Sequence, residues 1–225
     1  MKNPYQIVRD FEQAVADYTG APFVVAVNSC TSALMLAVAW HLRDRAFIRE
    51  RNQNDGHEVV ETIARPPISI PMRTYISVPK AIIHAGGWPT FREDDWHGAY
   101  QLKPLPVLDC ARRFTSNMYG GTLWANHGQM QCVSFQASKI LADTQGGAIL
   151  HDNPEADIWL RRARFDGRTE GVAPKDDTFT QIGWHCYMSN DVAARLLLKL
   201  HSLPRHNADL PNDPYPDLSA MDIFK

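Results

Sequence analysis

The sequence has no long hydrophobic run. No segment approaches the roughly 20 consecutive apolar residues that a helix needs to cross a bilayer. Residues 1–4 are not followed by an apolar stretch either, so we expect no secretory signal peptide. These two absences predict a cytoplasmic protein without a membrane partner.

Cysteine is scarce and widely spaced. The chain holds four cysteines, Cys30, Cys110, Cys132 and Cys186, and no two of them form a close pair. This spacing indicates neither a zinc site nor a disulfide framework. The nine histidines show no spacing typical of metal ligands. We therefore predict buried free thiols and no bound metal.

Neither sign of charge dominates, and internal repeats and low-complexity tracts are missing. The 23 basic residues against 25 acidic ones leave a net charge of −2, which is not the basic footprint of a general nucleic-acid-binding protein. A length of 225 residues with 44% hydrophobic content suits one globular domain with a sizeable core.

Helical and strand patterns alternate along the chain, which predicts an α/β protein. We place this domain at residues 1–203 and an extended C-terminal tail at residues 204–225, which contain four prolines and no periodicity. The expected helices cover residues 5–19, 33–42, 77–85, 154–165 and 193–200, and the expected strands cover residues 23–27, 68–71, 88–91 and 106–109.

A lysine lies on a turn between two apolar segments. Residues 131–135 and 148–150 read as short buried strands, and Lys139 follows the first of them. Partial burial of such a lysine would lower its pKa and give a nucleophilic amine able to form a Schiff base. The alternative is an ordinary surface lysine in a hairpin loop.

Two other polar positions follow predicted strands. Residues 28–32 enter a helix N-terminus, where free N–H groups favour an anion, although simple N-capping by Asn28 or Ser29 explains them equally well. Asp109 ends a strand, where a carboxylate would lie at the ligand-binding edge of an α/β sheet.

Four segments in matching order resemble the DegT/DnrJ/EryC1/StrS aminotransferases, which are sugar-nucleotide transaminases. The segments are the lysine motif of residues 134–148, Val-Asn-Ser-Cys-Thr-Ser-Ala-Leu at residues 27–34, Thr-Tyr-Ile-Ser at residues 74–77, and Leu-Asp-Cys-Ala-Arg at residues 108–112. Residues 183–189 resemble a further motif of the family. The resemblance covers residues 5–203 and implies the large domain of a type I PLP-dependent transferase, a mostly parallel sheet sandwiched by helices, without the C-terminal small domain.

The resemblance also implies pyridoxal 5'-phosphate (PLP) as cofactor and assigns roles to single residues. Lys139 is the Schiff-base lysine, and Asp109 is the partner of the pyridine nitrogen. The remaining cofactor-binding positions are Ser29, Cys30, Thr31 and Ser134 around the phosphate, Tyr75 stacked on the ring, Ala111 and Arg112 beside it, and His185 reaching the phosphate of a second subunit.

Several positions depart from the family pattern. Cys30 stands at the usual glycine of the phosphate loop, so either its φ is negative or the loop is strained. Arg112 replaces a histidine or glutamine, and His185 replaces an asparagine. The interval between Phe91 and Asp109 has no room for the expected strand–helix unit, which predicts the loss of one strand. Residues 43–66 look like a charged insertion.

The leading hypothesis is a homodimeric PLP-dependent aminotransferase of the sugar-nucleotide type, with its active site near the dimer interface and a small amine or sugar nucleotide as substrate. One alternative is a decarboxylase or isomerase acting on a bulky amine, such as an amino-acid-modified base in nucleic acid. The arginines that favour it are Arg112, Arg113, Arg161, Arg162 and Arg164. A catalytically retired scaffold is a further alternative. A binding module for a phosphorylated ligand would leave Lys139 and Asp109 without a role.

Overall fold

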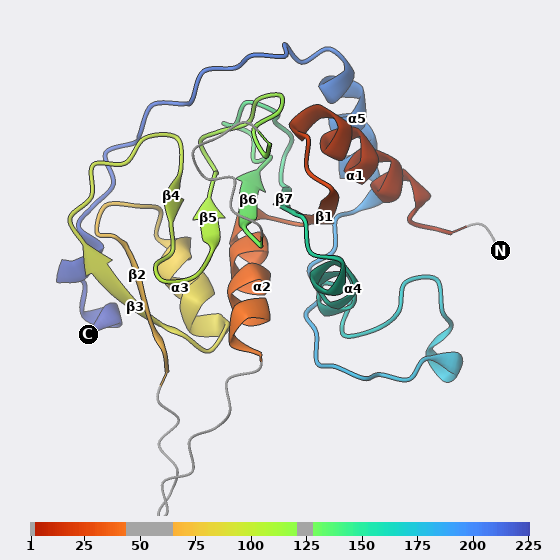
Figure 1. Cartoon of the computed structure of the whole chain (residues 1–225), viewed down its shortest axis with the longest axis horizontal. Helices are drawn as coiled ribbons and strands as arrows, with labels where there is room; N and C mark the ends of the chain where they lie inside the picture. The colour runs from red at the N-terminus through yellow and green to blue at the C-terminus, as the bar shows by residue number, and fades with distance from the viewer. Residues whose placement is uncertain (1–2, 44–64, 121–127) are drawn as a thin grey trace, which may run out of the picture.

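A computed structural model describes residues 3–43, 65–120 and 128–225 of the chain (Figure 1). Its helices are α1 (Gln6–Thr19), α2 (Cys30–Leu42), α3 (Ser77–His84), α4 (Pro154–Ala163) and α5 (Asn190–His201). Its strands are β1 (Phe23–Val27), β2 (Pro67–Pro71), β3 (Trp88–Arg92), β4 (Tyr100–Gln101), β5 (Val107–Asp109), β6 (Met130–Ser134) and β7 (Gly147–His151). The predicted insertion falls almost entirely outside the described residues.

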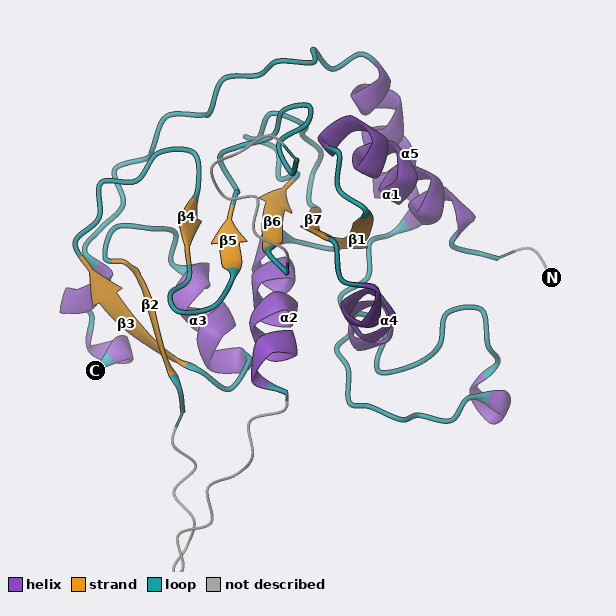
Figure 2. Ribbon diagram, viewed as in Figure 1, coloured by secondary structure: helices purple, strands orange, loops and turns teal. Residues whose placement is uncertain are grey.

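The strands lie in one row, β1-β7-β6-β5-β4 followed by β2-β3 (Figure 2). The two groups join where the backbone N–H of Ser69 donates to the carbonyl of Lys103 at 2.7 Å and the N–H of Lys103 donates back at 3.0 Å. The pairs β5–β6 and β2–β3 are parallel, whereas β7 and β4 are antiparallel to the strands beside them. The sheet is therefore mixed, although most of its strands share one direction, and the predicted α/β fold is confirmed.

Strand β4 was not predicted from the sequence. The expected strand–helix unit is indeed missing between Phe91 and Asp109, but the interval contains a two-residue strand that pairs with β5, with Tyr100 opposite Asp109. An antiparallel neighbour needs only a tight turn, whereas a parallel one needs a crossover of a dozen or more residues. The expectation of a simple strand loss was therefore wrong in this respect: a short hairpin strand takes up the space.

Helices cover both faces of the sheet, because its strands bury side chains on both sides. In β1, Val25 and Val27 face a core formed with α2, α3 and α4, while Val24 and Ala26 face a second core formed with α1 and α5. The alternating pattern of a strand thus divides the apolar residues between two layers of helices, as the sequence predicts (Figure 2). In the described part of the chain, no helix has both the length and the apolar character to cross a membrane.

Residues 204–225 contain no α-helix or strand, yet they pack closely on the domain. They run from α5 back to the edge formed by β2 and β3 (Figure 1). Leu218 and Phe224 are buried there, and the ring of Phe224 contacts that of Phe91. The predicted extended tail is therefore a docked segment.

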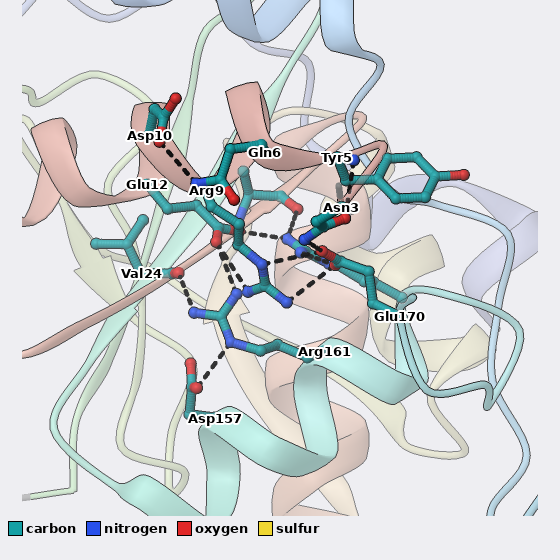
Figure 3. A network of polar contacts seen from close by, with 12 residues as sticks. Asn3, Tyr5, Gln6, Arg9, Asp10, Glu12, Val24, Asp157, Arg161 and Glu170 are labelled. Carbon is teal, nitrogen blue, oxygen red and sulfur yellow. Dashed lines mark hydrogen bonds and ion pairs between the residues drawn. The ribbon is translucent and has the colours of Figure 1, made fainter. Parts of the chain in front are cut away.

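A buried ionic network joins α1, β1 and α4 (Figure 3). Glu12, which is 4% exposed, accepts hydrogen bonds from Arg161 at 2.6 Å and from the backbone N–H of Ala26 at 2.8 Å, and it also pairs with Arg164, which is 1% exposed. Glu170 accepts from Arg9 and from Arg164. Because every charge in this network has a partner of opposite sign, burial of the arginines is tolerated only while the carboxylates are present.

Replacing Glu12 by alanine tests this dependence. We expect Glu12→Ala to lower the free energy of unfolding by about 3–5 kcal/mol, because it leaves the Arg164 guanidinium buried with one carboxylate fewer. Denaturant unfolding followed by circular dichroism measures the change. Asp10→Ala on the same helix is the control, since within the described residues the Asp10 side chain bonds only to the exposed Gln6 side chain. Equal losses in both variants would contradict the role of Glu12.

Candidate active site

The strand ends that carry polar residues meet at one edge of the sheet. Asp109 is the last residue of β5 and Ser134 is the last residue of β6, while Ser29 follows β1. Strand β7 runs the other way, so its first residue, Gly147, lies at the same edge. A cavity of about 400 Å³ opens there, where ligands of open α/β sheets bind.

All the predicted site residues except His185 line this cavity. They are Ser29, Cys30, Thr31, Tyr75, Asp109, Ala111, Arg112, Ser134 and Lys139. The side chain of His185 is 70% exposed and its Nδ1 lies 2.8 Å from a carboxylate oxygen of Asp166. Within one chain, His185 therefore stays outside the site.

The N-terminus of α2 faces the cavity. The Ser29 hydroxyl caps the helix by accepting from the N–H of Ser32 at 3.1 Å, and the Thr31 hydroxyl lies 2.8 Å from that of Ser77. Cys30 is the first helical residue and is not among the residues of positive φ, so no glycine is needed at this position. The helix begins three residues earlier than the predicted Ala33, because its cap is Ser29.

A glycine lets two backbone segments meet beside this helix end. A Cβ on Gly147 would lie 2.5 Å from the backbone N of Cys30 and 2.5 Å from the carbonyl carbon of Ser29. No side chain fits in such a space, which accounts for the second glycine of the Gly-Gly pair. Gly146 has a φ of 135°, a conformation that favours glycine. The start of β7 is therefore held directly against the α2 N-terminus.

Lys139 lies on the loop between β6 and β7 and is half-buried. Its pKa is lowered, first by burial and then by the positive charge of Arg112. No described residue forms a hydrogen bond or an ion pair with its side chain. The amine is therefore available as a nucleophile, which matches the predicted property.

The Lys139 loop is fixed at its base. The N–H of Asp143 donates to the carbonyl of Phe135 at 2.7 Å, and the N–H of Phe135 donates to the carbonyl of Gly146 at 2.9 Å. The buried Asp143 carboxylate accepts from Arg195 of α5 at 2.9 Å, and this hydrogen-bonded partner holds the pKa of Asp143 well below its usual range. The loop is thus pinned to a rigid helix on the opposite side of the sheet.

Asp109 is 5% exposed and both of its oxygens have donors. The N–H of Ala111 donates to Oδ1 at 2.9 Å, and the hydroxyl of Tyr100 donates to Oδ2 at 2.7 Å. Burial raises the pKa of Asp109, and these two hydrogen bonds oppose that rise. They favour the ionised carboxylate at the position where the sequence predicts it.

Tyr100 is a site residue that the sequence analysis missed. Its hydroxyl also lies 2.6 Å from that of Thr74. Since Tyr100 has a single proton and gives it to Asp109, Thr74 must be the donor in the second bond. The pKa of Tyr100 is raised by burial and by the charge of Asp109, so it remains a donor. Tyr100 lies next to Asp109 because it belongs to strand β4, which the sequence analysis does not predict.

The docked C-terminal segment contributes further lining residues. Asp213 and Tyr215 border the cavity, together with Trp96. Arg112, which is buried, pairs through Nη2 with Asp213 at 2.8 Å, and its Nε has no hydrogen-bond partner among the described residues. No sequence signal pointed to these residues, because they lie in segments without helical or strand periodicity.

The model of the DegT/DnrJ/EryC1/StrS aminotransferase family matches residues 1–104 and 99–210. The chain belongs to this family. The match covers every element that surrounds the cavity, but it stops at residue 210, before Asp213 and Tyr215.

Curated members of the family are distant relatives of this chain. The spore coat polysaccharide biosynthesis protein SpsC of Bacillus subtilis is 24% identical over 88% of this chain and 56% of its own length. GDP-perosamine synthase of Caulobacter vibrioides is 23% identical over 90% of this chain and 58% of its own length. The chain thus spans little more than half the length of these relatives.

Solved structures of aminotransferases share the fold. The sugar aminotransferase CalS13 from Micromonospora echinospora superposes with a TM-score of 0.65 at 19% identity, over 88% of this chain and 60% of that protein. At this level of identity the likeness concerns the fold alone.

Replacing Tyr100 by phenylalanine tests its hydrogen bond to Asp109. We expect Tyr100→Phe to destabilise the fold by about 1–3 kcal/mol at mildly alkaline pH, because a buried carboxylate loses a donor. The substitution raises the pKa of Asp109 further, so the folded variant binds this proton at higher pH than the wild type does. The loss of unfolding free energy is therefore largest at pH values above the pKa of Asp109 in the folded variant. It becomes smaller as the pH falls through this pKa.

Unfolding free energies at mildly alkaline and mildly acidic pH measure this difference. Tyr18→Phe is the control, because the hydroxyl of Tyr18 donates to the carbonyl of Pro204 and not to a carboxylate. If the deficit of Tyr100→Phe does not depend on pH, the bond to Asp109 is not what the hydroxyl contributes.

Proposed function

We propose that this protein is a PLP-dependent aminotransferase of the sugar-nucleotide type. The observation that carries the proposal is the convergence of three groups on one cavity: the amine of Lys139, the carboxylate of Asp109 and the N-terminus of α2. An amine nucleophile, a buried carboxylate and an anion site are the groups that a phosphorylated pyridine aldehyde requires.

The residues that line the cavity fit this cofactor. The α2 N-terminus with the hydroxyls of Ser29, Thr31 and Ser134 suits a phosphate. No described residue forms an ion pair with the buried Asp109, and a protonated ring nitrogen would supply such a partner. Arg112 has an Nε–H without a partner, in the place where the family resemblance puts the ring hydroxyl.

The chain's own residues have distinct roles in this proposal. When bound, PLP supplies an aldehyde that condenses with amines and a ring that accepts the electron pair released at the substrate carbon. Lys139 acts as the nucleophile and then as the group that moves a proton, for which its lowered pKa is suited. Asp109 keeps a proton on the ring nitrogen, and Tyr100 orients Asp109.

The assignment of a sugar nucleotide as substrate rests on the relatives, one of which is named GDP-perosamine synthase. The nucleic-acid alternative loses support, because most of the arginines that favoured it pair with carboxylates of the same chain. These pairs are Arg112–Asp213, Arg113–Asp209, Arg161–Glu12 and Arg164–Glu12. The retired-scaffold alternative leaves the unpaired amine of Lys139 unexplained.

Replacing Lys139 tests the proposal directly. The purified protein mixed with PLP should develop a visible absorption band, and borohydride should then fix the cofactor on the peptide that contains Lys139, as read by mass spectrometry. Lys139→Ala should lose the band and the adduct, whereas Lys175→Ala, which changes an exposed lysine outside the cavity, should keep both. An unchanged band in Lys139→Ala would sink the assignment.

A homodimer in the cytoplasm completes the proposal. The segment that carries His185 also exposes two apolar side chains, Phe179 and Ile182, which are 53% and 85% exposed. A second subunit covering this segment would bury both and would bring His185 to a neighbouring site. The structure has buried free thiols at Cys30, Cys110, Cys132 and Cys186. Free thiols are compatible with a reducing compartment.

Analytical ultracentrifugation at micromolar concentration tests the dimer. We expect a dimer for the wild type and a shift toward monomer for Ile182→Asp, because a charge at that position opposes burial of the segment. Ile158→Asp is the matched control on another exposed apolar residue, at helix α4. A wild-type monomer that still carries out transamination would exclude the shared site.

A further inference from the structure

Residues 211–217 form a stiff segment that lies outside the family match, which ends at residue 210. Pro211, Pro214 and Pro216 fix three of its φ angles. The segment passes along the sheet edge that holds the cavity (Figure 1). Its conformation is therefore largely set before any ligand arrives, which lowers the entropy cost of using it as a binding surface.

Backbone contacts hold the segment at both ends. The N–H of Leu210 donates to the carbonyl of Arg112 at 2.9 Å, and the N–H of Leu218 donates to the carbonyl of Met72 at 2.9 Å. Asp209 accepts from Arg113 at 2.6 Å and occupies the space that a side chain on residue 98 would fill, where the chain has a glycine. The segment is thus tied both to the loop after β5 and to the loop after β2.

Two side chains of the segment face the cavity. The carboxylate of Asp213, which is 64% exposed, lies 2.8 Å from Nη2 of Arg112 and accepts from the hydroxyl of Tyr215 at 3.3 Å. The ring of Tyr215 stacks on that of Trp96, with 6.3 Å between centroids and 16° between planes. Burial raises the pKa of Tyr215 to about 12, so its hydroxyl remains a donor.

One wall of the cavity consists of Arg112, Asp213, Tyr215 and Trp96. The contacts among these residues determine which ligands the wall can bind. Asp213 neutralises Arg112, so a carboxylate ligand gains little there and is repelled by Asp213. A carboxylate has about four acceptor positions, and only two of those on Asp213 are engaged by described residues. The free positions suit hydroxyl donors, while the neighbouring Tyr215 and Trp96 rings offer apolar surface. A hydroxylated ring matches both.

We propose that Asp213 and Tyr215 determine specificity by binding the sugar ring of the substrate and by disfavouring carboxylates at Arg112. This inference rests on the proposed function for the substrate class, but it concerns a segment that the family match does not include. Its test depends on ligand affinity and needs no turnover.

Isothermal titration calorimetry of the cofactor-loaded protein tests the proposal. The probes are UDP-glucose, GDP-glucose and dTDP-glucose, which lack the keto group needed for reaction, and succinate as a simple dicarboxylate. The variants are Asp213→Asn and Tyr215→Ala. Their controls are Asp222→Asn, which changes an exposed aspartate of the same tail that pairs only with Lys225, and Tyr215→Phe, which keeps the ring.

The two probes compared are succinate and the sugar nucleotide that the wild type binds most tightly, and they should respond to Asp213→Asn in opposite directions. Asp213→Asn should weaken the best sugar nucleotide about tenfold, which corresponds to one hydrogen bond to a charged group, and should strengthen succinate. Tyr215→Ala should weaken the sugar nucleotide by about tenfold, and Tyr215→Phe by no more than about threefold. Asp222→Asn should bind both probes as the wild type does.

Other outcomes overturn the proposal. Equal weakening of both probes in Asp213→Asn would mean that the segment only holds the fold together. Binding of succinate but of no sugar nucleotide by the wild type would exclude the proposed ligand class at this wall. Failure of the wild-type protein to form the PLP adduct on Lys139, by contrast, would overturn the proposed function itself. Thermal unfolding of each variant identifies those that fail to fold. If Tyr215→Ala fails to fold, Asp213→Asn, which keeps the size of the side chain, carries the test.

Discussion

The backbone contact between Gly147 and the Ser29–Cys30 peptide sets the geometry of the whole site. It leaves no space for a Cβ, so the start of β7 lies against the first turn of α2. The Lys139 loop ends at this point, and the helix N-terminus begins there. One close approach of two main chains therefore fixes the distance between the amine and the anion site.

The sequence predicts much of the geometry of this core because local chemistry determines it. Continuous apolar or β-favouring runs mark β1 and β6, and a polar cap at Asn28 or Ser29 marks the start of α2. Asp109 ends β5 and Lys139 follows β6, and both line the cavity because the C-terminal ends of these parallel strands meet at one edge of the sheet. These features depend on a few neighbouring residues, which a single sequence displays.

The remaining part of the site depends on long-range contacts that a single sequence does not display. Strand β4 has only two residues, too few for an alternating pattern, yet it brings Tyr100 to Asp109. Asp213 reaches Arg112 across about half the chain, from a segment whose prolines suggest only the absence of regular structure. The docking of the tail is equally invisible in the sequence, since the burial of Leu218 and Phe224 follows from where the tail packs.

The narrow junction between β4 and β2 has a further consequence. Two backbone hydrogen bonds at Ser69 and Lys103 join the β2–β3 pair to the rest of the sheet. Asp109 and Lys139 lie on one side of this seam, while Tyr75 and Ser77 lie on the other. A ligand that contacts residues on both sides stabilises the association of the β2–β3 pair with the rest of the sheet, because separating the two would also expose the ligand to solvent. Occupancy of the cavity and cohesion of the sheet are therefore thermodynamically linked, and the domain is most cooperative when its site is filled.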